Sequence, residues 1–272
     1  MKLIAVGDNV TDTYVDEGIY YPGGNCINVA VDAKKAGATS AGYMGIFGND
    51  VRAMHIQDAL DQEDVEQVRC RRVYAPTAMP KVIIAPDGDR QFQAGPQDSA
   101  QHLFKLRLTQ TDRQIINSYD VLHTSIYSNI EADLTTFDSH VKIAFDFSDC
   151  RDEDYLAKTL PLVDLAFFSG STLHDDEAES LAAHWLALGP EVVVITRGGQ
   201  PALLQTATQR VYQRPEPVDI VDTMGAGDSF IAGFLVAYAD GKSLDACGVR
   251  AAANAKATCQ LHGGFGHGHP FA

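Results

Sequence analysis

The sequence predicts an α/β fold in which a mainly parallel sheet carries helices on both faces. Short apolar runs of strand length alternate with helical patterns along most of the chain, and such alternation needs crossover connections between parallel strands. Of the 272 residues, 45% are hydrophobic and 21% charged, as in an ordinary globular protein. No linker or internal repeat divides the chain, so we expect one domain over residues 1–272.

The predicted elements follow one another from the N-terminus. Leu3–Val6 is a short apolar run that predicts a buried first strand. Residues 25–36 have helical spacing of Ile27 and Val31 and end before Gly37, a residue suited to a helix C-terminus. The same patterns predict strands at 41–46, 121–123, 142–147, 165–169 and 192–196, and helices at 50–60, 112–118, 152–160 and 176–188.

One stretch interrupts this alternation. Residues 79–85 and 90–93 flank Pro86-Asp87-Gly88-Asp89, and an Asp-Gly pair between apolar runs indicates a hairpin. No helix separates these runs, so we expect an antiparallel flap outside the main sheet, to which residues 13–21 would add strands. A hairpin at the edge of the main sheet is the alternative that this pattern leaves open.

Net charge and cysteine content indicate which partners and which cellular compartment the protein is expected to have. The formal net charge of −15 disfavours nucleic acid and anionic membrane surfaces as partners. No apolar run reaches the roughly 20 residues that a membrane span needs, and the N-terminus has an acidic residue too early for a signal peptide. The five cysteines are scattered without a CxxC pair, which fits a reducing compartment, so we expect a cytoplasmic protein.

The segment Asp222-Thr223-Met224-Gly225-Ala226-Gly227-Asp228-Ser229-Phe230 precedes an apolar helical run. Its small residues would leave backbone N–H groups bare at a helix N-terminus, where the helix dipole attracts phosphate or a developing anion. Asp228 beside such a site is either a base that removes a proton or a simple helix cap. Neither a Walker A motif nor a dinucleotide fingerprint is present, because Val236 and Phe230 stand where each needs glycine.

A second polar segment, Gly23-Gly24-Asn25-Cys26-Ile27-Asn28-Val29-Ala30, also precedes a helix. Asn25 and Asn28 lie one turn apart, and amides that donate and accept hydrogen bonds suit the hydroxyls of a polyol. Asp8 follows the first strand and Asp12 lies shortly after it, at the edge where open α/β sheets bind ligands. Two helix-capping residues and a turn, without any role in binding, would produce the same pattern.

Together these motifs resemble the ribokinase (PfkB-type) carbohydrate kinases. The matching residues are the early Gly7-Asp8 with Asp12, the Gly-Gly-Asn-x-x-Asn-x-Ala segment and the Asp-Thr-x-Gly-Ala-Gly-Asp-x-Phe segment, within a similarity from Leu3 to about Gly264. The resemblance implies a ribokinase-like three-layer αβα sandwich with a small β lid contributed by residues 13–22 and 78–94. It also implies that the lid closes over the sugar and can pair two subunits.

The resemblance further implies roles for individual residues. Asp228 would accept the proton of the sugar hydroxyl, and the amides of Gly225, Ala226 and Gly227 would stabilise the transferring phosphoryl group. The sugar would be held by Asp8, Asp12, Gly24 and Asn28, and the nucleotide would be bordered by Thr196, Gly198 and Asn254. The implied cofactors are ATP and Mg²⁺, with a monovalent cation such as K⁺ as an activator.

Two departures from the family pattern affect the metal and the nucleotide. Where many relatives carry Asn-x-x-Glu, this chain reads Ser169-Gly170-Ser171-Thr172, so its magnesium ligands stay unassigned. The acids that follow, at 175–177, predict a helix start. The segment 197–201 reads Arg-Gly-Gly-Gln-Pro, where a typical relative has glycine near position 201.

Three longer segments, 23–31, 144–149 and 215–235, resemble the members of the family that phosphorylate fructoselysine. The implied reaction is ATP-dependent phosphorylation of a primary hydroxyl on fructoselysine or a related fructosamine. A kinase for fructose, ribose or a keto-deoxy sugar acid, and a non-catalytic sugar- or nucleotide-binding relative, are the alternatives. A substrate longer than a hexose needs polar groups beyond the sugar, and the lid candidates for this are Asp16, Glu17, Tyr20, Tyr21, Arg90 and Gln91.

Histidines cluster only at the C-terminal end. His262, His267 and His269 could supply three imidazoles to a metal, but the glycines between them predict a mobile terminus instead. His123, alone within a predicted strand, is expected to be a core residue.

Overall fold

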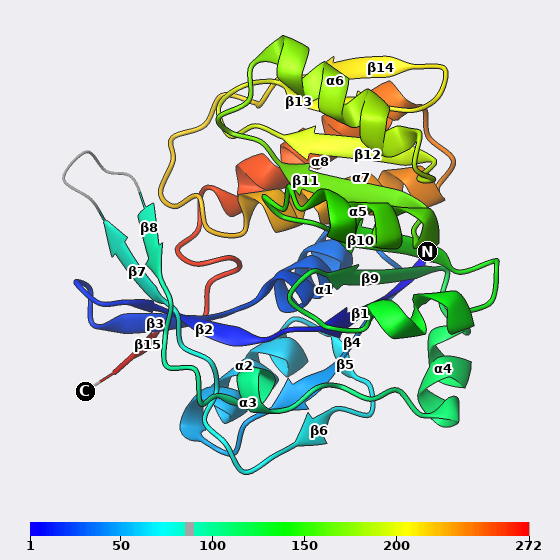
Figure 1. Cartoon of the computed structure of the whole chain (residues 1–272). Helices are drawn as coiled ribbons and strands as arrows, with labels where there is room; N and C mark the ends of the chain where they lie inside the picture. The colour runs from blue at the N-terminus through cyan, green and yellow to red at the C-terminus, as the bar shows by residue number, and fades with distance from the viewer. Residues whose placement is uncertain (85–89, 272) are drawn as a thin grey trace.

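The computed structural model describes the backbone of residues 1–84 and 90–271, with the side chains of all of these except 84 and 90–92. A large sheet crosses the molecule, and a smaller sheet extends from it (Figure 1). The large sheet has the order β14-β13-β12-β11-β10-β9-β1-β4-β5, with β6 also paired to β4. Its strands are β1 (Lys2–Gly7), β4 (Ser40–Phe47), β5 (Glu66–Gln67), β6 (Arg71–Arg72), β9 (Val121–Ser125), β10 (Lys142–Asp146), β11 (Leu165–Ser169), β12 (Val192–Thr196), β13 (Ala202–Gln205) and β14 (Arg210–Gln213).

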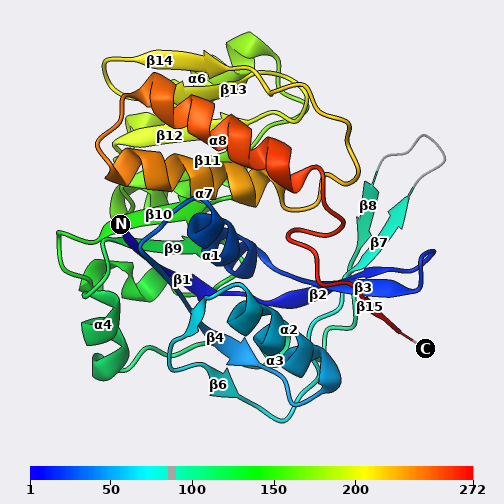
Figure 2. The same ribbon diagram turned by 180° about the vertical axis from the view of Figure 1, so that it is seen from behind.

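The sheet is parallel from β5 to β12, as predicted, and antiparallel at the β12–β13–β14 edge. Helices cover both faces, as the two opposite views show (Figures 1 and 2). One face carries α1 (Asn25–Lys35), α2 (Val51–Gln62), α7 (Ala226–Ala239) and α8 (Leu244–Thr258), and the other α4 (Gln110–Ile116), α5 (Glu153–Thr159) and α6 (Asp175–Leu186). Short helical turns complete the chain at α3 (Ala100–Leu103), η1 (Glu131–Thr136) and η2 (Leu160–Leu162).

Strand β1 shows why the sequence folds into three layers. All residues from Leu3 to Val6 are buried. Because successive side chains of a strand point to opposite faces of the sheet, both faces of β1 are covered. Leu3 and Ala5 join the apolar core beneath α1 and α7, whereas Ile4 and Val6 join the core on the α4 side. A continuous apolar run is therefore the expected sequence of a strand covered on both faces.

The acidic residues at 175–177 begin a helix, as predicted. Helix α6 has all three in its first turn, and the Glu177 side chain accepts a hydrogen bond from the backbone N–H of His174. Helix α8 and the β13–β14 hairpin were not predicted. Helix α8 nevertheless has a capping Ser243 and buries residues 244, 247, 248, 251 and 252, which is helical spacing.

The smaller sheet has the order β15-β3-β2-β7-β8 and projects away from the large one (Figure 1). Its strands are β2 (Val10–Tyr14), β3 (Ile19–Gly23), β7 (Lys81–Ile84), β8 (Arg90–Gln93) and β15 (His269–Pro270). The flap outside the main sheet is thus confirmed, and the alternative of an edge hairpin of the main sheet is wrong. The expected turn at 86–89 lies outside the described residues.

The prediction of a mobile C-terminal tail is wrong. The backbone N–H of Gly263 donates to Asp222 at 3.0 Å, Phe265 is buried, and His267 bonds to Glu63 at 2.7 Å. Strand β15 then pairs with β3. Contacts with residues far away in the sequence hold a glycine-rich segment that has no local structural preference. Within residues 1–84 and 90–271, no group of three or more His, Cys, Asp or Glu residues could hold a metal ion, so three imidazoles do not converge.

Asp32 on α1 gives a stability prediction. Its carboxyl is buried between helices, one oxygen has no hydrogen-bond partner among the described residues, and burial raises its pKa to about 7. An unfolded chain ionises this group near its ordinary pKa of 3.8, so the native state loses stability as the pH rises from about 4 to 7. Asp32→Asn should raise the free energy of unfolding by at least about 1 kcal/mol at pH 8, and by less at pH 5.

Urea unfolding at both pH values measures this effect. The control is Asp58→Asn on α2, where the parent side chain is exposed. An equal gain at pH 5 and pH 8 would rule out ionisation of Asp32 as its cause.

Candidate active site

A cleft of about 580 Å³ lies where the carboxyl ends of β1, β10, β11 and β12 meet the N-termini of α1 and α7. We call it the main cleft. The sequence-predicted site residues that line it are Asp8, Asp12, Gly24, Asn28, Thr196, Gly227 and Asp228. Parallel strands end at one edge, which is why residues from positions 8 to 228 converge there.

The loop before α7 is shaped by Gly225. This residue has a φ of +72° and serves as the helix N-cap, and a Cβ added to it would lie 2.8 Å from the Cα of Gly264. The helix begins at Ala226, so N–H groups of its first turn lack partners within the helix. The Ala226 N–H donates to the carbonyl of Thr223 at 3.2 Å, so this amide of the predicted trio already has a partner in a turn.

Asp228 does not cap its helix through its side chain, because the N-cap is Gly225 and has no side-chain bond. Its two carboxylate oxygens instead accept from the amide nitrogens of Asn25 and Asn28, each at 2.7 Å. Burial raises the pKa of Asp228 well above its ordinary value, and the nearby carboxylates of Asp146 and Asp8 raise it further. The group is therefore a stronger base than an ordinary aspartate, held in one orientation from helix α1.

Asn25 connects strands β9 and β10 to this carboxylate. Its amide nitrogen donates to Asp228 and also to Asp146 at 2.8 Å, which turns its oxygen toward Nε2 of His123 at 2.8 Å. His123 is fully buried, as expected, and burial lowers its pKa to about 3. The imidazole is thus neutral, and its Nε2–H donates to Asn25 and fixes the amide. Sequence reasoning assigned no such role to Asn25 or His123, whose partners lie about 100 to 200 residues away.

Asp8 and Asp12 also line the main cleft. Asp8 accepts from the backbone N–H of Asn25 at 2.8 Å and thereby supports the start of α1. Burial raises its pKa, and burial together with the carboxylates of Asp222 and Asp8 raises the pKa of Asp12 to about 7. Gly24, with a φ of +105°, packs its backbone against Asp8 and Asn9.

The predicted nucleotide-side residues separate in space. Thr196 ends β12 within the main cleft, whereas Gly198 and Asn254 are not among the described residues that line it. Asn254 lies on α8 against Gly233 of α7, at a contact between helices. Arg197, at the start of the segment that departs from the family pattern near Pro201, is buried and bonds to Asp175 at 2.6 Å, so it holds the 197–201 loop against α6.

The residues present fit a magnesium ion bound mainly by phosphates and water. Asp146 and Asp149 line the main cleft, and Mg²⁺ in kinases is commonly held by one or two carboxylates together with substrate phosphates. Burial raises the pKa of Asp146 to about 6, and Asp8 and Asp149 add to this, so a cation there would relieve carboxylate repulsion.

Tyr20 and Tyr21, which the sequence analysis considered for the far end of the substrate, lie away from the main cleft. Tyr20 packs on His55, His269 and Arg52, and Tyr21 packs on Tyr14 and His262, so neither lines the main cleft. Asp16 and Glu17 lie exposed in the β2–β3 turn, and the side chains of Arg90 and Gln91 lie outside the described part. The small sheet contributes Val10, Asp12 and the neighbouring Pro80 to the cleft instead.

Solved structures share this architecture. Ribokinase of Arabidopsis thaliana, determined with ribose and ATP, matches with a TM-score of 0.81 at 20% identity, over 96% of this chain and 93% of that chain. A ribokinase of Thermotoga maritima matches with a TM-score of 0.78 at 20% identity, over 97% and 95%. The protein thus has the ribokinase fold, as the sequence resemblance implied.

Sequence comparison identifies the family. Residues 1–266 match the model of the pfkB family carbohydrate kinases. Fructosamine kinase FrlD of Bacillus subtilis (strain 168) is 44% identical over the whole chain and 95% of its own length. Fructoselysine 6-kinase of Escherichia coli (strain K12) is 32% identical over 97% of this chain and 100% of its own. The chain belongs to the pfkB family of carbohydrate kinases and is a sugar kinase.

Proposed function

We propose that this kinase transfers the γ-phosphoryl group of ATP to the primary hydroxyl of fructoselysine, giving fructoselysine 6-phosphate. The observation that carries the proposal is the 44% identity, over the full chain, to a relative named as a fructosamine kinase. The half-buried, amide-held Asp228 beside a helix N-terminus supports the chemistry.

In the proposed reaction the sugar oxygen attacks the γ-phosphorus as its proton passes to the Asp228 carboxylate. The new O–P bond forms while the bond from the γ-phosphorus to the bridging oxygen of ADP breaks, and ADP leaves. The first-turn amides of α7, including Gly227, stabilise the charge on the phosphoryl oxygens. Asp8, Asp12, Gly24 and Asn28 hold the sugar, and Thr196 borders the nucleotide, with Gly198 and Asn254 as outer contacts.

Bound Mg²⁺ would neutralise phosphate charge, and Asp146 and Asp149 are the residues that would hold its shell. A monovalent cation such as K⁺ would act as an activator. The small sheet would serve as the lid, and its β8 edge, which pairs with β7 alone among the described strands, could join a second copy.

A cytoplasmic location is part of this proposal. All five cysteines are free thiols, which suits a reducing compartment. No helix in the described ranges is both long and apolar enough to cross a bilayer.

The proposal predicts a preference between substrates. Binding energy from the added amine and amino acid, remote from the reacting hydroxyl, should raise kcat/KM for the longer substrate. We expect kcat/KM for fructoselysine to exceed that for fructose at least about tenfold, or about 1.4 kcal/mol in transition-state binding. Release of ADP, measured with ATP and Mg²⁺ for both sugars, tests this.

Equal values, or a preference for fructose, would identify a plain-sugar kinase, and ribose and a keto-deoxy sugar acid complete the panel. If no sugar of this panel causes release of ADP, the result would support a non-catalytic binding protein.

A further inference from the structure

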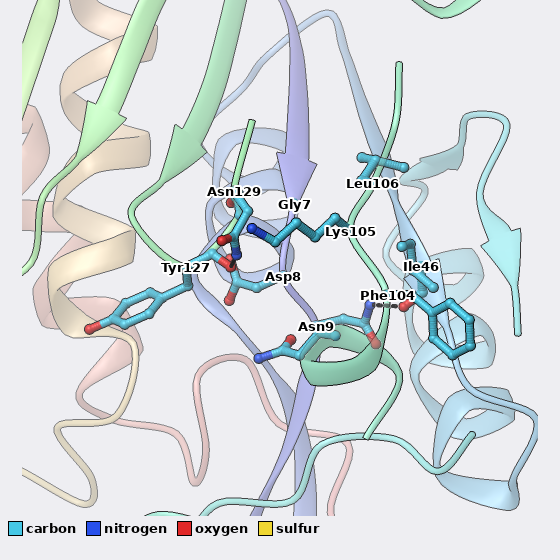
Figure 3. Close-up of a pocket in the computed structure, with 11 residues that line it drawn as sticks. Gly7, Asp8, Asn9, Ile46, Phe104, Lys105, Leu106, Tyr127 and Asn129 are labelled. Atoms are coloured by element: carbon cyan, nitrogen blue, oxygen red, sulfur yellow. Dashed lines mark hydrogen bonds between the residues drawn. The ribbon is translucent and has the colours of Figure 1, made fainter. Parts of the chain in front are cut away.

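A second, smaller pocket adjoins the main cleft beyond Asp8, and we call it the annex. Asp8, Gln101 and Tyr127 line both pockets, so the two adjoin each other. The annex is bounded further by the 104–106 loop and by Asn129 (Figure 3). Its volume of about 20 Å³ is room for about one water molecule, so a longer group would lie across its mouth.

The two pockets differ in charge. The main cleft is lined by five carboxylates: Asp8, Asp12, Asp146, Asp149 and Asp228. Of the described residues that line either pocket, Lys105 is the only one with a basic side chain. Lys105 is exposed and forms no ion pair with another described residue, and its side chain reaches from the 104–106 loop across the pocket (Figure 3). A substrate with a carboxylate would be repelled by the main cleft and attracted here.

Gln101, at the junction of the two pockets, offers an unused acceptor. Its side-chain oxygen is buried and has no hydrogen-bond partner among the described residues. A buried acceptor without a partner costs about 1–3 kcal/mol, and a ligand N–H at this point would remove that cost. The amide oxygen is neutral, yet it favours a protonated amine because a hydrogen bond to a charged donor is stronger.

The shape of a fructosamine matches this order of groups. Its reacting primary hydroxyl and the carbon that carries the amine are at opposite ends of the sugar. With the hydroxyl at Asp228, the amine end can extend past Asp8, which lines both the main cleft and the annex. Asn25 bonds to both Asp8 and Asp228, so Asp8 lies near the base as well as at the annex.

We infer that the annex recognises the amino-acid end of the substrate. Lys105 pairs with the α-carboxylate at its mouth, and the side-chain oxygen of Gln101 accepts from the protonated secondary amine. This inference rests on the proposed function. It assigns substrate specificity to Lys105 and Gln101 in place of the lid residues that the sequence analysis considered.

The test compares three acceptors in each variant: fructoselysine, fructose, and the fructosamine of pentylamine, which keeps the secondary amine but lacks the α-carboxylate together with the α-ammonium. In Lys105→Gln, the ratio of kcat/KM for fructoselysine to that for the pentylamine compound should fall about fivefold to tenfold. Lys105→Arg should restore most of it. In Gln101→Met, which keeps the volume but lacks the acceptor, both fructosamines should lose about fivefold or more relative to fructose.

Lys158→Gln on α5, also an exposed lysine, is the matched control and should change no ratio. Unchanged ratios in both Lys105→Gln and Gln101→Met, in a parent enzyme that prefers fructoselysine, would overturn the inference and leave the proposed function intact. A parent enzyme without that preference would instead overturn the proposed function, and the inference with it.

Discussion

The Asp228→Asn variant is expected to fold and to bind ATP like the parent enzyme, but to turn over about 10²–10⁴-fold more slowly. Asparagine keeps the shape of the side chain and can accept from one of Asn25 and Asn28, but it cannot accept the proton of the sugar hydroxyl. Steady-state kinetics with fructoselysine, together with calorimetric titration of ATP, measure both halves of this prediction.

The pH profile gives an independent test of the same residue. Burial raises the pKa of Asp228, so the parent kcat/KM should fall with decreasing pH in a range above that of an ordinary aspartate. The residual activity of Asp228→Asn should lack the contribution of Asp228 to this limb, whereas the titration of Asp12 and Asp146, with pKa values of about 7 and about 6, remains. Asp176→Asn, in the exposed first turn of α6, is the control for adding an amide at a helix start. Near-parent turnover of Asp228→Asn would mean that the carboxylate only orders the loop.

The Gly24→Ala variant should lose about 10²-fold in kcat/KM and about 1–3 kcal/mol in the free energy of unfolding. Gly24 has a φ of +105° and a ψ of 141°, a conformation that side chains rarely adopt. An added Cβ would lie 2.9 Å from both the Cα of Asn9 and a carboxylate oxygen of Asp8. Relief of this contact must move either the start of α1 or the Asp8 carboxylate, and both belong to the proposed sugar site.

Kinetics and urea unfolding of Gly24→Ala measure the two losses. Gly199→Ala is the matched control, because no heavy atom lies within 4 Å of the position that its Cβ would occupy. Retention of parent kcat/KM in Gly24→Ala would show that the sugar site tolerates a shift at this corner.

Local sequence was sufficient for the central strands of the large sheet, β4, β1 and β9 to β12, but not for its edge strands. Val192–Thr196 and Leu165–Ser169 have the predicted bounds, because apolar runs between polar segments can be satisfied only as strands buried on both faces. Helix α8 was missed although its signal was present in Ser243 and in the spacing of its buried residues. Helix α8 was therefore predictable from its local sequence.

The C-terminal tail is a different case. Glycine and histidine alternate in it without a hydrophobic period, so no local pattern predicts a structure. Its position depends on Asp222, whose buried carboxylate accepts from Gly263, from Met224 and from the hydroxyl of Tyr14. One side chain thereby joins the tail, the loop before α7 and the small sheet, and only the folded chain brings these three together.

The sequence by itself determined the parallel sheet, the glycine-shaped start of α7, the family and the identity of the candidate base. Only the tertiary structure decided what surrounds that base: Asn25 and Asn28 from helix α1, His123 behind Asn25, and the annex with Lys105. The reason is that secondary structure and motifs depend on neighbours within a few residues. Hydrogen-bond partners, burial and the resulting pKa shifts depend on residues about 100 to 200 positions apart, whose approach is fixed only when the layers pack.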